Sequence, residues 1–154
     1  MAEDSSPEPG IAGAPSLLYL IKQVELAVKS HLDTLVAPYG LTAIQLTALS
    51  VVGRNPGTTS ARLARNAFVT LQSSAQTIAL LEERGWIVRE ADPTSRRQLR
   101  IFLSEKGREV LRELAEPIDA LERDMLQDVP AADVATFRRV LQDVRHRLGG
   151  SHPH

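Results

Sequence analysis

Apolar residues recur every three to four positions over several long stretches of this chain, which is the period of an amphipathic helix. The first such stretch predicts a helix that Ser16 caps and that Pro38-Tyr39-Gly40 ends. A second helix is predicted from Thr42 through Val52, closed by Gly53. The apolar stripe of the first helix is wide, which indicates that this helix is covered on more than one side.

Two shorter helices follow the turn that Asn55-Pro56-Gly57 predicts. The first covers 61–65 and is capped by Thr59 or Ser60, and a tight connection over 66–69 leads to the second. Thr70 caps that second helix, which runs to Arg84 and is followed by Gly85 as its left-handed terminating residue. Its predicted inward positions are Leu71, Ser74 or Ala75, Ile78 and Leu81.

The apolar period then changes to that of strands, which are predicted at 86–89 and 98–103. Residues 91–97 between them form a turn-forming loop, with Arg96 and Arg97 at its tip. Ser104 caps a long helix that runs to Met125 and that Pro117 is expected to bend. Asp128-Val129-Pro130 breaks it before a last helix, whose apolar seam at 134, 137, 141, 144 and 148 favours packing on a partner.

The predicted fold is therefore mainly α with a small β-hairpin wing, in a single domain over residues 16–148. Within it, 41–103 form a winged helix-turn-helix, and 16–37 and 104–148 form dimerisation helices. Residues 1–15 carry three of the nine prolines and predict a flexible arm, and residues 149–154 predict a flexible tail.

The charge is unevenly distributed although the 154-residue chain has a net charge of only -1. Residues 54–108 carry 10 basic and 5 acidic side chains, so this segment is +5 while each flank is -3. A local basic segment is what contact with phosphates requires. Charge alone leaves open whether these side chains contact nucleic acid or line an ordinary solvated surface.

Several classes of protein are excluded by composition and motifs. The chain has no cysteine, which excludes disulfides, cysteine-ligated metals and thiol chemistry. It has none of the common nucleophile, zinc-protease or phosphate-loop motifs, so we expect no enzyme, no cofactor and no dedicated metal site. His152 and His154 lie in the tail, and His31 and His146 lie on polar helix faces. No secretory signal or membrane span is evident, so we expect a cytoplasmic protein without membrane contact.

The order of the elements carries the functional information. A short helix, a tight turn, a longer helix and a basic hairpin place one helix in the major groove of DNA, with a wing arginine beside it. The exposed face of the longer helix and the hairpin supply the candidate DNA-binding residues, which are Thr70, Gln72, Ser73, Gln76, Thr77, Arg96 and Arg97. The alternative is a winged helix used for protein interaction or dimerisation without specific DNA binding.

Specific motifs support the first interpretation. They are Leu41-Thr42-Ala43-Ile44-Gln45, Ala61-x-Leu63-Ala64-Arg65, Val69-Thr70, Leu81-Glu82-x-x-Gly85-Trp86-Ile87, Asp92-Pro93-x-x-Arg96-Arg97 and Leu103-Ser104-x-x-Gly107. With these motifs the chain resembles the MarR family of bacterial transcriptional regulators. The resemblance implies a repressor that binds a palindromic operator on double-stranded DNA as a homodimer, and in many members a small aromatic effector. Two departures are Ser95, where the family often has an acidic residue, and Ser74-Ala75, where a larger apolar residue often anchors the recognition helix.

Overall fold

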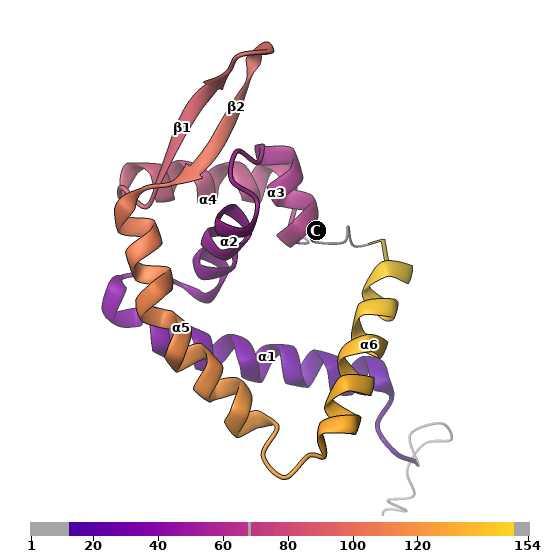
Figure 1. The fold of residues 1–154 in the computed structure, drawn as a ribbon. Helices are drawn as coiled ribbons and strands as arrows, with labels where there is room; N and C mark the ends of the chain where they lie inside the picture. Colours follow the sequence, from indigo (N-terminus) through magenta and orange to yellow (C-terminus); the bar gives the residue numbers. More distant parts are fainter. Residues whose placement is uncertain (1–12, 68, 150–154) are drawn as a thin grey trace, which may run out of the picture.

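The computed structural model describes residues 13–67 and 69–149, without the side chain of Arg96. These residues form α1 (Leu17–Val36), a 3-10 helix (Ala37–Tyr39), α2 (Ala43–Arg54), α3 (Ser60–Ala67), α4 (Leu71–Glu83), β1 (Ile87–Asp92), β2 (Ser95–Leu103), α5 (Glu105–Met125) and α6 (Ala131–Arg147). The two strands pair antiparallel and project from the helices as a hairpin (Figure 1). The predicted mainly helical fold with a two-stranded wing is confirmed. Most of the predicted arm, and the tail with His152 and His154, lie outside the described residues.

The predicted helix starts are confirmed because each depends on a local hydrogen bond. The side-chain oxygens of Ser16, Thr42, Thr70 and Ser104 each accept from the backbone N–H three residues ahead, at 3.1 to 3.2 Å. Thr42 and Gln45 form a capping box, because the backbone N–H of Thr42 also donates to the side-chain oxygen of Gln45. Each cap satisfies N–H groups that a helix leaves without partners.

One hydrophobic core joins the helix-turn-helix to the base of the hairpin and to the first half of α5. Six elements (α2, α3, α4, β1, β2 and α5) contribute its largest completely buried apolar side chains, which are Leu49, Leu63, Ile78, Leu81, Ile87, Ile101 and Leu114. By contrast, Val36 is the only buried residue of α1, and α6 has none. The recognition elements are therefore built on the core, while the outer helices contribute little to it.

Two helices end later than predicted. Gly53 does not end α2, which continues to Arg54 and is capped by Asn55. A Cβ at Gly53 would lie 3.2 Å from the side chains of Leu103 and Leu111, so glycine there allows close packing on β2 and α5. The helix predicted over 61–65 is also longer, since α3 runs from Ser60 to Ala67. The α5 helix continues through Pro117.

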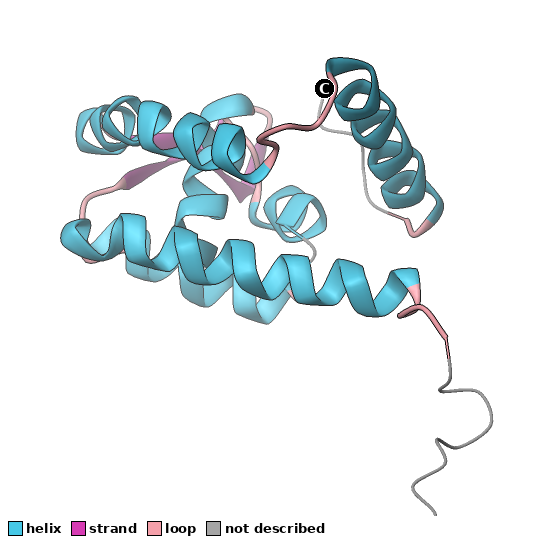
Figure 2. Cartoon of the chain, turned by 90° about the horizontal axis from the view of Figure 1, so that it is seen from below, coloured by secondary structure: helices cyan, strands magenta, loops and turns pink. Residues whose placement is uncertain are grey.

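The outer helices α1 and α6 lie at the end of the molecule opposite the wing, and α5 runs from the base of the wing toward them (Figure 1). Asp128, with a φ of +64°, lies in the break between α5 and α6, as predicted. Seen from below, α6 stands apart from the layer of the other helices (Figure 2). An ion pair of 3.0 Å between Arg138 and Glu122 ties it to α5. In the described residues no single helix is long and apolar enough to cross a membrane; only α1 with the 3-10 helix and α2, bent by 82°, reach that length together.

Candidate nucleic-acid interface

The helix-turn-helix is held together by a polar contact at the crossing of its two helices. Ser74 of α4 is buried, and its hydroxyl donates to the carbonyl oxygen of Ser60 at the start of α3 (3.3 Å). The small side chain lets the two backbones approach, and its hydrogen bond compensates for the buried hydroxyl. The departure from a larger apolar anchor therefore has a structural explanation. Ala75 is exposed, so of the two predicted inward positions only Ser74 faces the core.

The outer face of α4 is polar. Gln72 and Gln76 are both exposed and lie one helical turn apart, with Ser73 and Thr77 half-buried on one flank. Thr70 is also exposed, and its hydroxyl accepts the N–H of Ser73 as the helix cap. Each glutamine amide offers both donors and an acceptor, which is the chemistry that reads base edges in the major groove.

The wing is longer than predicted, and its arginines do not lie at the tip. Residues 91–97 were expected to form a loop, whereas only Pro93 and Thr94 separate β1 from β2. The strand pairing jumps from Ala91–Leu99 to Asp92–Ser95. Arg96, Arg97 and Gln98 therefore bulge out of β2 without partners on β1. The bulge interrupts the alternation of apolar and polar residues, which is why the sequence pattern indicated a loop.

The tip itself is closed by a different set of residues. The Asp92 carboxylate accepts both the backbone N–H (2.9 Å) and the hydroxyl (2.7 Å) of Thr94. These two hydrogen bonds, with the charge of Arg100, hold the pKa of Asp92 below its usual value. Arg97 is exposed, and the side chain of Arg96 lies outside the described part of the structure.

Two other arginines hold the wing in place. Arg89 of β1 forms a two-point ion pair with Glu82 of α4, with distances of 2.9 and 2.8 Å. The hydrogen bonds from Arg89 lower the pKa of Glu82. Arg100 of β2 lies beside Gly57, whose φ of +81° suits glycine and where a Cβ would collide with the guanidinium. Both arginines therefore orient the wing and do not project toward a ligand.

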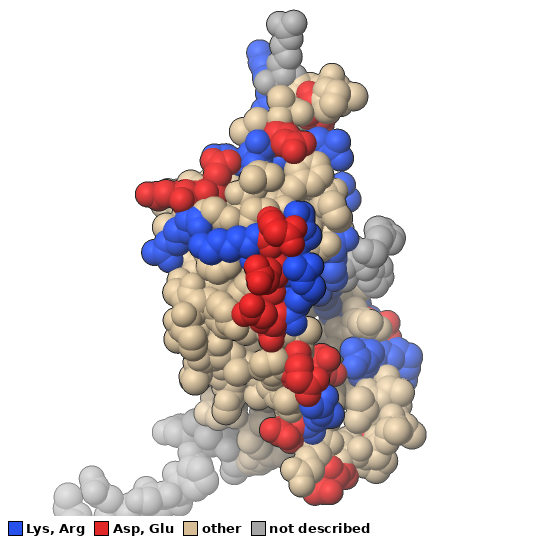
Figure 3. Space-filling model, turned by 60° about the vertical axis from the view of Figure 1, so that its left-hand side comes forward, with Lys and Arg blue, Asp and Glu red and all other residues tan. Residues whose placement is uncertain are grey.

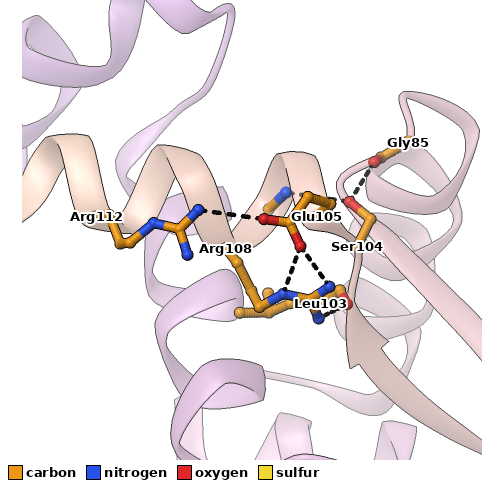
Figure 4. Close-up of polar contacts among 7 residues, drawn as sticks. Gly85, Leu103, Ser104, Glu105, Arg108 and Arg112 are labelled. Carbon is orange, nitrogen blue, oxygen red and sulfur yellow. Dashed lines mark hydrogen bonds and ion pairs between the residues drawn. The ribbon is translucent and has the colours of Figure 1, made fainter.

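The end of α4 is fastened to the start of α5 (Figure 4). The Ser104 hydroxyl donates to the carbonyl oxygen of Gly85 (2.6 Å) and accepts the N–H of Gly107 (3.1 Å). Lys106 donates to the carbonyl oxygen of Arg84 (2.9 Å), and its ammonium lies 3.9 Å from the ring centre of Trp86. This junction sets the position of the recognition helix relative to α5.

Ion pairs continue along α5. Glu105 binds Arg108 (2.8 Å) and Arg112 (3.2 Å), and these hydrogen bonds lower its pKa. On the face drawn in Figure 3, acidic and basic side chains lie interspersed in one stripe. That face is therefore an ordinary solvated surface without an excess of one sign of charge.

Four arginines of the basic segment remain available to a ligand. Their side chains are exposed and make no hydrogen bond or ion pair with the described residues; they are Arg54, Arg62, Arg65 and Arg97. The predicted sites did not include Arg62 and Arg65, although both lie on α3 opposite the buried pair Leu63 and Ala64. That helical spacing is the signal that identifies them.

A hollow lies between α1 and α5. This cavity of about 640 Å³ is lined mainly by apolar side chains, among them Val24, Val28, Leu121 and Met125, with His31 also in its lining. Within residues 13–67 and 69–149, no group of three or more His, Asp or Glu residues could hold a metal ion. The described part of the chain thus offers one polar helix face beside a wing, and one apolar groove away from it.

Comparison with known proteins gives consistent matches. The MarR family model matches residues 39–98. The HTH-type transcriptional repressor Rv2887 of Mycobacterium tuberculosis is 29% identical over 133 residues, which are 86% of this chain and 96% of that protein. Its crystal structure with salicylic acid has a TM-score of 0.68 at 28% identity, over 87% of this chain and 99% of that one.

Two further structures share the fold. The transcriptional regulator SlyA has a TM-score of 0.80 at 24% identity, over 87% of this chain and 94% of that one. CouR from Rhodococcus jostii RHA1, bound to p-coumaroyl-CoA, has a TM-score of 0.76 at 24% identity, over 84% and 91% of the two chains. The match therefore extends over the outer helices as well as the helix-turn-helix.

Proposed function

Because the chain belongs to the MarR family of winged helix-turn-helix transcriptional regulators, a family of DNA-binding proteins without enzymatic activity, we propose that it represses transcription by binding a specific operator. In this proposal α4 enters the major groove, the wing lies beside it, and Thr70, Gln72, Ser73, Gln76, Thr77, Arg96 and Arg97 contact the DNA. The observation that carries it is the polar outer face of α4, flanked by the exposed Arg62, Arg65 and Arg97.

The proposed binding unit is a homodimer formed by residues 16–37 and 104–148. Of the seventeen large apolar side chains exposed in the described residues, ten belong to α1 and α6. An exposed apolar surface of this extent on α1 and α6 is typical of a protein interface. Two copies related by a twofold axis would present two α4 helices to two half-sites about one turn of DNA apart, which requires a palindromic operator.

A small aromatic ligand is the proposed signal for release. Support comes from two relatives, whose structures hold salicylic acid and p-coumaroyl-CoA. The apolar groove between α1 and α5 has the volume of a small-molecule site and lies on a helix that is joined to the end of α4. Adding salicylate to the protein–operator complex tests this part of the proposal, because release should raise the unbound DNA fraction.

The principal test is selection of bound duplexes from a random pool, followed by affinity measurements on the selected operator. Gln72→Ala and Gln76→Ala should each weaken binding by about 1–3 kcal/mol and relax the base preference at one position per half-site. Glu83→Ala, which truncates an exposed side chain at the opposite end of α4, is the matched control and should leave the base preference unchanged.

Two outcomes would contradict the proposal. If no sequence is enriched at any salt concentration, the alternative of a protein-interaction or dimerisation module is favoured. If a sequence is enriched but both glutamine variants keep its affinity and preference, the outer face of α4 is not the reading surface. Affinity must also fall steeply with salt, since phosphate contacts release counterions.

A further inference from the structure

Leu71 lies at the first position of α4 and is exposed, although its helical spacing predicts a core residue. Its side chain is 59% exposed, whereas Ile78 and Leu81 on the same side of the helix are each 1% exposed. Leu71 belongs to the end of α4 that the core does not cover. An apolar side chain at this point of a recognition helix, between Thr70 and Gln72, therefore faces whatever α4 binds.

The surroundings of Leu71 form a hollow that we name the wing notch. It has a volume of about 300 Å³ and lies between the start of α3, α4 and the wing, and its lining includes Leu71, Ile78, Arg89, Arg97, Leu99 and Ile101. Its two exposed leucines, Leu71 and Leu99, come from α4 and β2, and so do its two buried isoleucines. The wing notch is therefore an apolar recess at the edge of the proposed DNA-binding face.

The charge around the wing notch favours DNA as its occupant. The described residues that line it include two arginines and no carboxylate. Arg89 is paired with Glu82, but Arg97 is exposed without a partner among the described residues and can contact a phosphate. The next residues along α4, Gln72 and Ser73, belong to the proposed reading face. A ligand that combines a negatively charged phosphate backbone with a small apolar group matches both the exposed charge of Arg97 and the apolar lining of the wing notch.

Base edges in the major groove offer one apolar group, the 5-methyl group of thymine. The first turn of a recognition helix is the part that approaches base edges most closely. We infer that Leu71 is a specificity-determining residue that contacts a thymine methyl group in each half-site of the operator. The inference rests on the proposed function and adds an apolar contact to the polar reading by Gln72 and Gln76.

The test replaces thymine by deoxyuridine in the selected operator, one position per half-site at a time. This change removes the methyl group and keeps base pairing, so the wild-type protein reports on the contact without any change to its fold. At one thymine position the wild-type affinity should fall about fourfold for each half-site, the effect of one buried methyl group of about 0.8 kcal/mol.

Protein variants then assign the effect to a side chain. Leu71→Ala should bind thymine and deoxyuridine operators equally at that position. Val88→Ala, which truncates an exposed apolar residue of β1 outside the wing notch, should keep the fourfold preference. Comparing the thymine-to-deoxyuridine affinity ratio of each variant with that of the wild type removes the effect of the methyl group on DNA shape, because all the proteins bind the same two operators. Alanine favours the helix, so Leu71→Ala should keep the wild-type helical signal in circular dichroism.

Three results would overturn the inference. Wild-type protein that is indifferent to deoxyuridine at every position would show that no thymine methyl is contacted. A preference that survives in Leu71→Ala, or that disappears in Val88→Ala instead, would assign the contact to another residue. These results differ from failure of the proposed function, in which no operator is enriched from the pool at all.

Discussion

Gly107→Ala tests whether the junction between the recognition helix and α5 is built as described. Gly107 is buried in the first turn of α5, and a Cβ there would overlap the carbonyl oxygen of Trp86. That oxygen belongs to the backbone and accepts the N–H of Ser104 (3.1 Å), so it cannot swing aside as a side chain would. The first turn of α5 would therefore have to move away from the end of α4.

The magnitude follows from the contacts that this movement breaks. The two hydrogen bonds from Ser104 to the carbonyl oxygens of Trp86 and Gly85 would be lost, at about 1 kcal/mol each. Overpacking of the buried site adds about 1–3 kcal/mol. Alanine in place of glycine inside a helix returns about 1 kcal/mol. The free energy of unfolding should therefore fall by about 2–4 kcal/mol.

Gly53→Ala is the matched control, since it makes the same change inside another helix. There the added Cβ would meet only the δ-carbons of Leu103 and Leu111, both at 3.2 Å, and these ends of flexible side chains can rotate. Its free energy of unfolding should stay within about 1 kcal/mol of the wild-type value.

Urea denaturation measures the free energy of unfolding of both variants and of the wild type. All samples need the same protomer concentration, because the stability of a dimer depends on concentration. Operator affinity should fall for Gly107→Ala, since the displaced junction holds the end of α4. The reasoning is refuted if Gly107→Ala is as stable as the wild type, or if Gly53→Ala is the more damaging change.

Two further predictions concern the dimer and the wing. Phe137→Glu places a carboxylate in the exposed apolar face of α6 and should dissociate the dimer in analytical ultracentrifugation and abolish operator binding; a DNA-binding dimer of this variant would contradict the proposed interface. Arg97→Ala should lower the slope of log affinity against log salt concentration by about 1 per protomer, and the double variant with Arg96→Ala by about 2, with unchanged stability. A slope equal to that of the wild type in the double variant would show that the wing makes no phosphate contact.

The helix starts could be predicted because each depends on residues close in sequence. The N-cap residues Ser16, Thr42, Thr70 and Ser104 each bond an N–H only three residues away, so the sequence contains both partners. The Ser104-x-x-Gly107 motif is local in one respect, because the Ser104 hydroxyl caps α5 by accepting the N–H of Gly107. The need for glycine at position 107 is not local, since it comes from the close approach of the Trp86 carbonyl oxygen.

The errors arise where contacts distant in sequence decide the structure. Gly53 reads as a helix terminator, but packing of α2 against Leu103 and Leu111 keeps it inside the helix. Leu71 has the helical spacing of a core residue, but it lies on the part of α4 that the core does not cover. In the wing, the bulge over 96–98 hides the true length of β2, because strand register depends on the partner strand.

The basic side chains near the candidate site likewise fall into two groups that the sequence alone does not distinguish. A count of charges treats the ten basic residues of 54–108 as equivalent. Five of them make hydrogen bonds that hold the scaffold together, namely Arg84, Arg89, Arg100, Lys106 and Arg108. Their positive charge is directed at backbone carbonyl oxygens or carboxylates of the protein itself. The charge that remains for phosphates comes from the exposed arginines of α3 and the wing and from Arg54. The excess of positive charge over 54–108 therefore comes in large part from side chains that stabilise the scaffold, and only the remainder is free for the proposed DNA contacts. Only the tertiary structure separates the arginines that position α4 and the wing from those whose side chains stay exposed and are proposed to contact DNA.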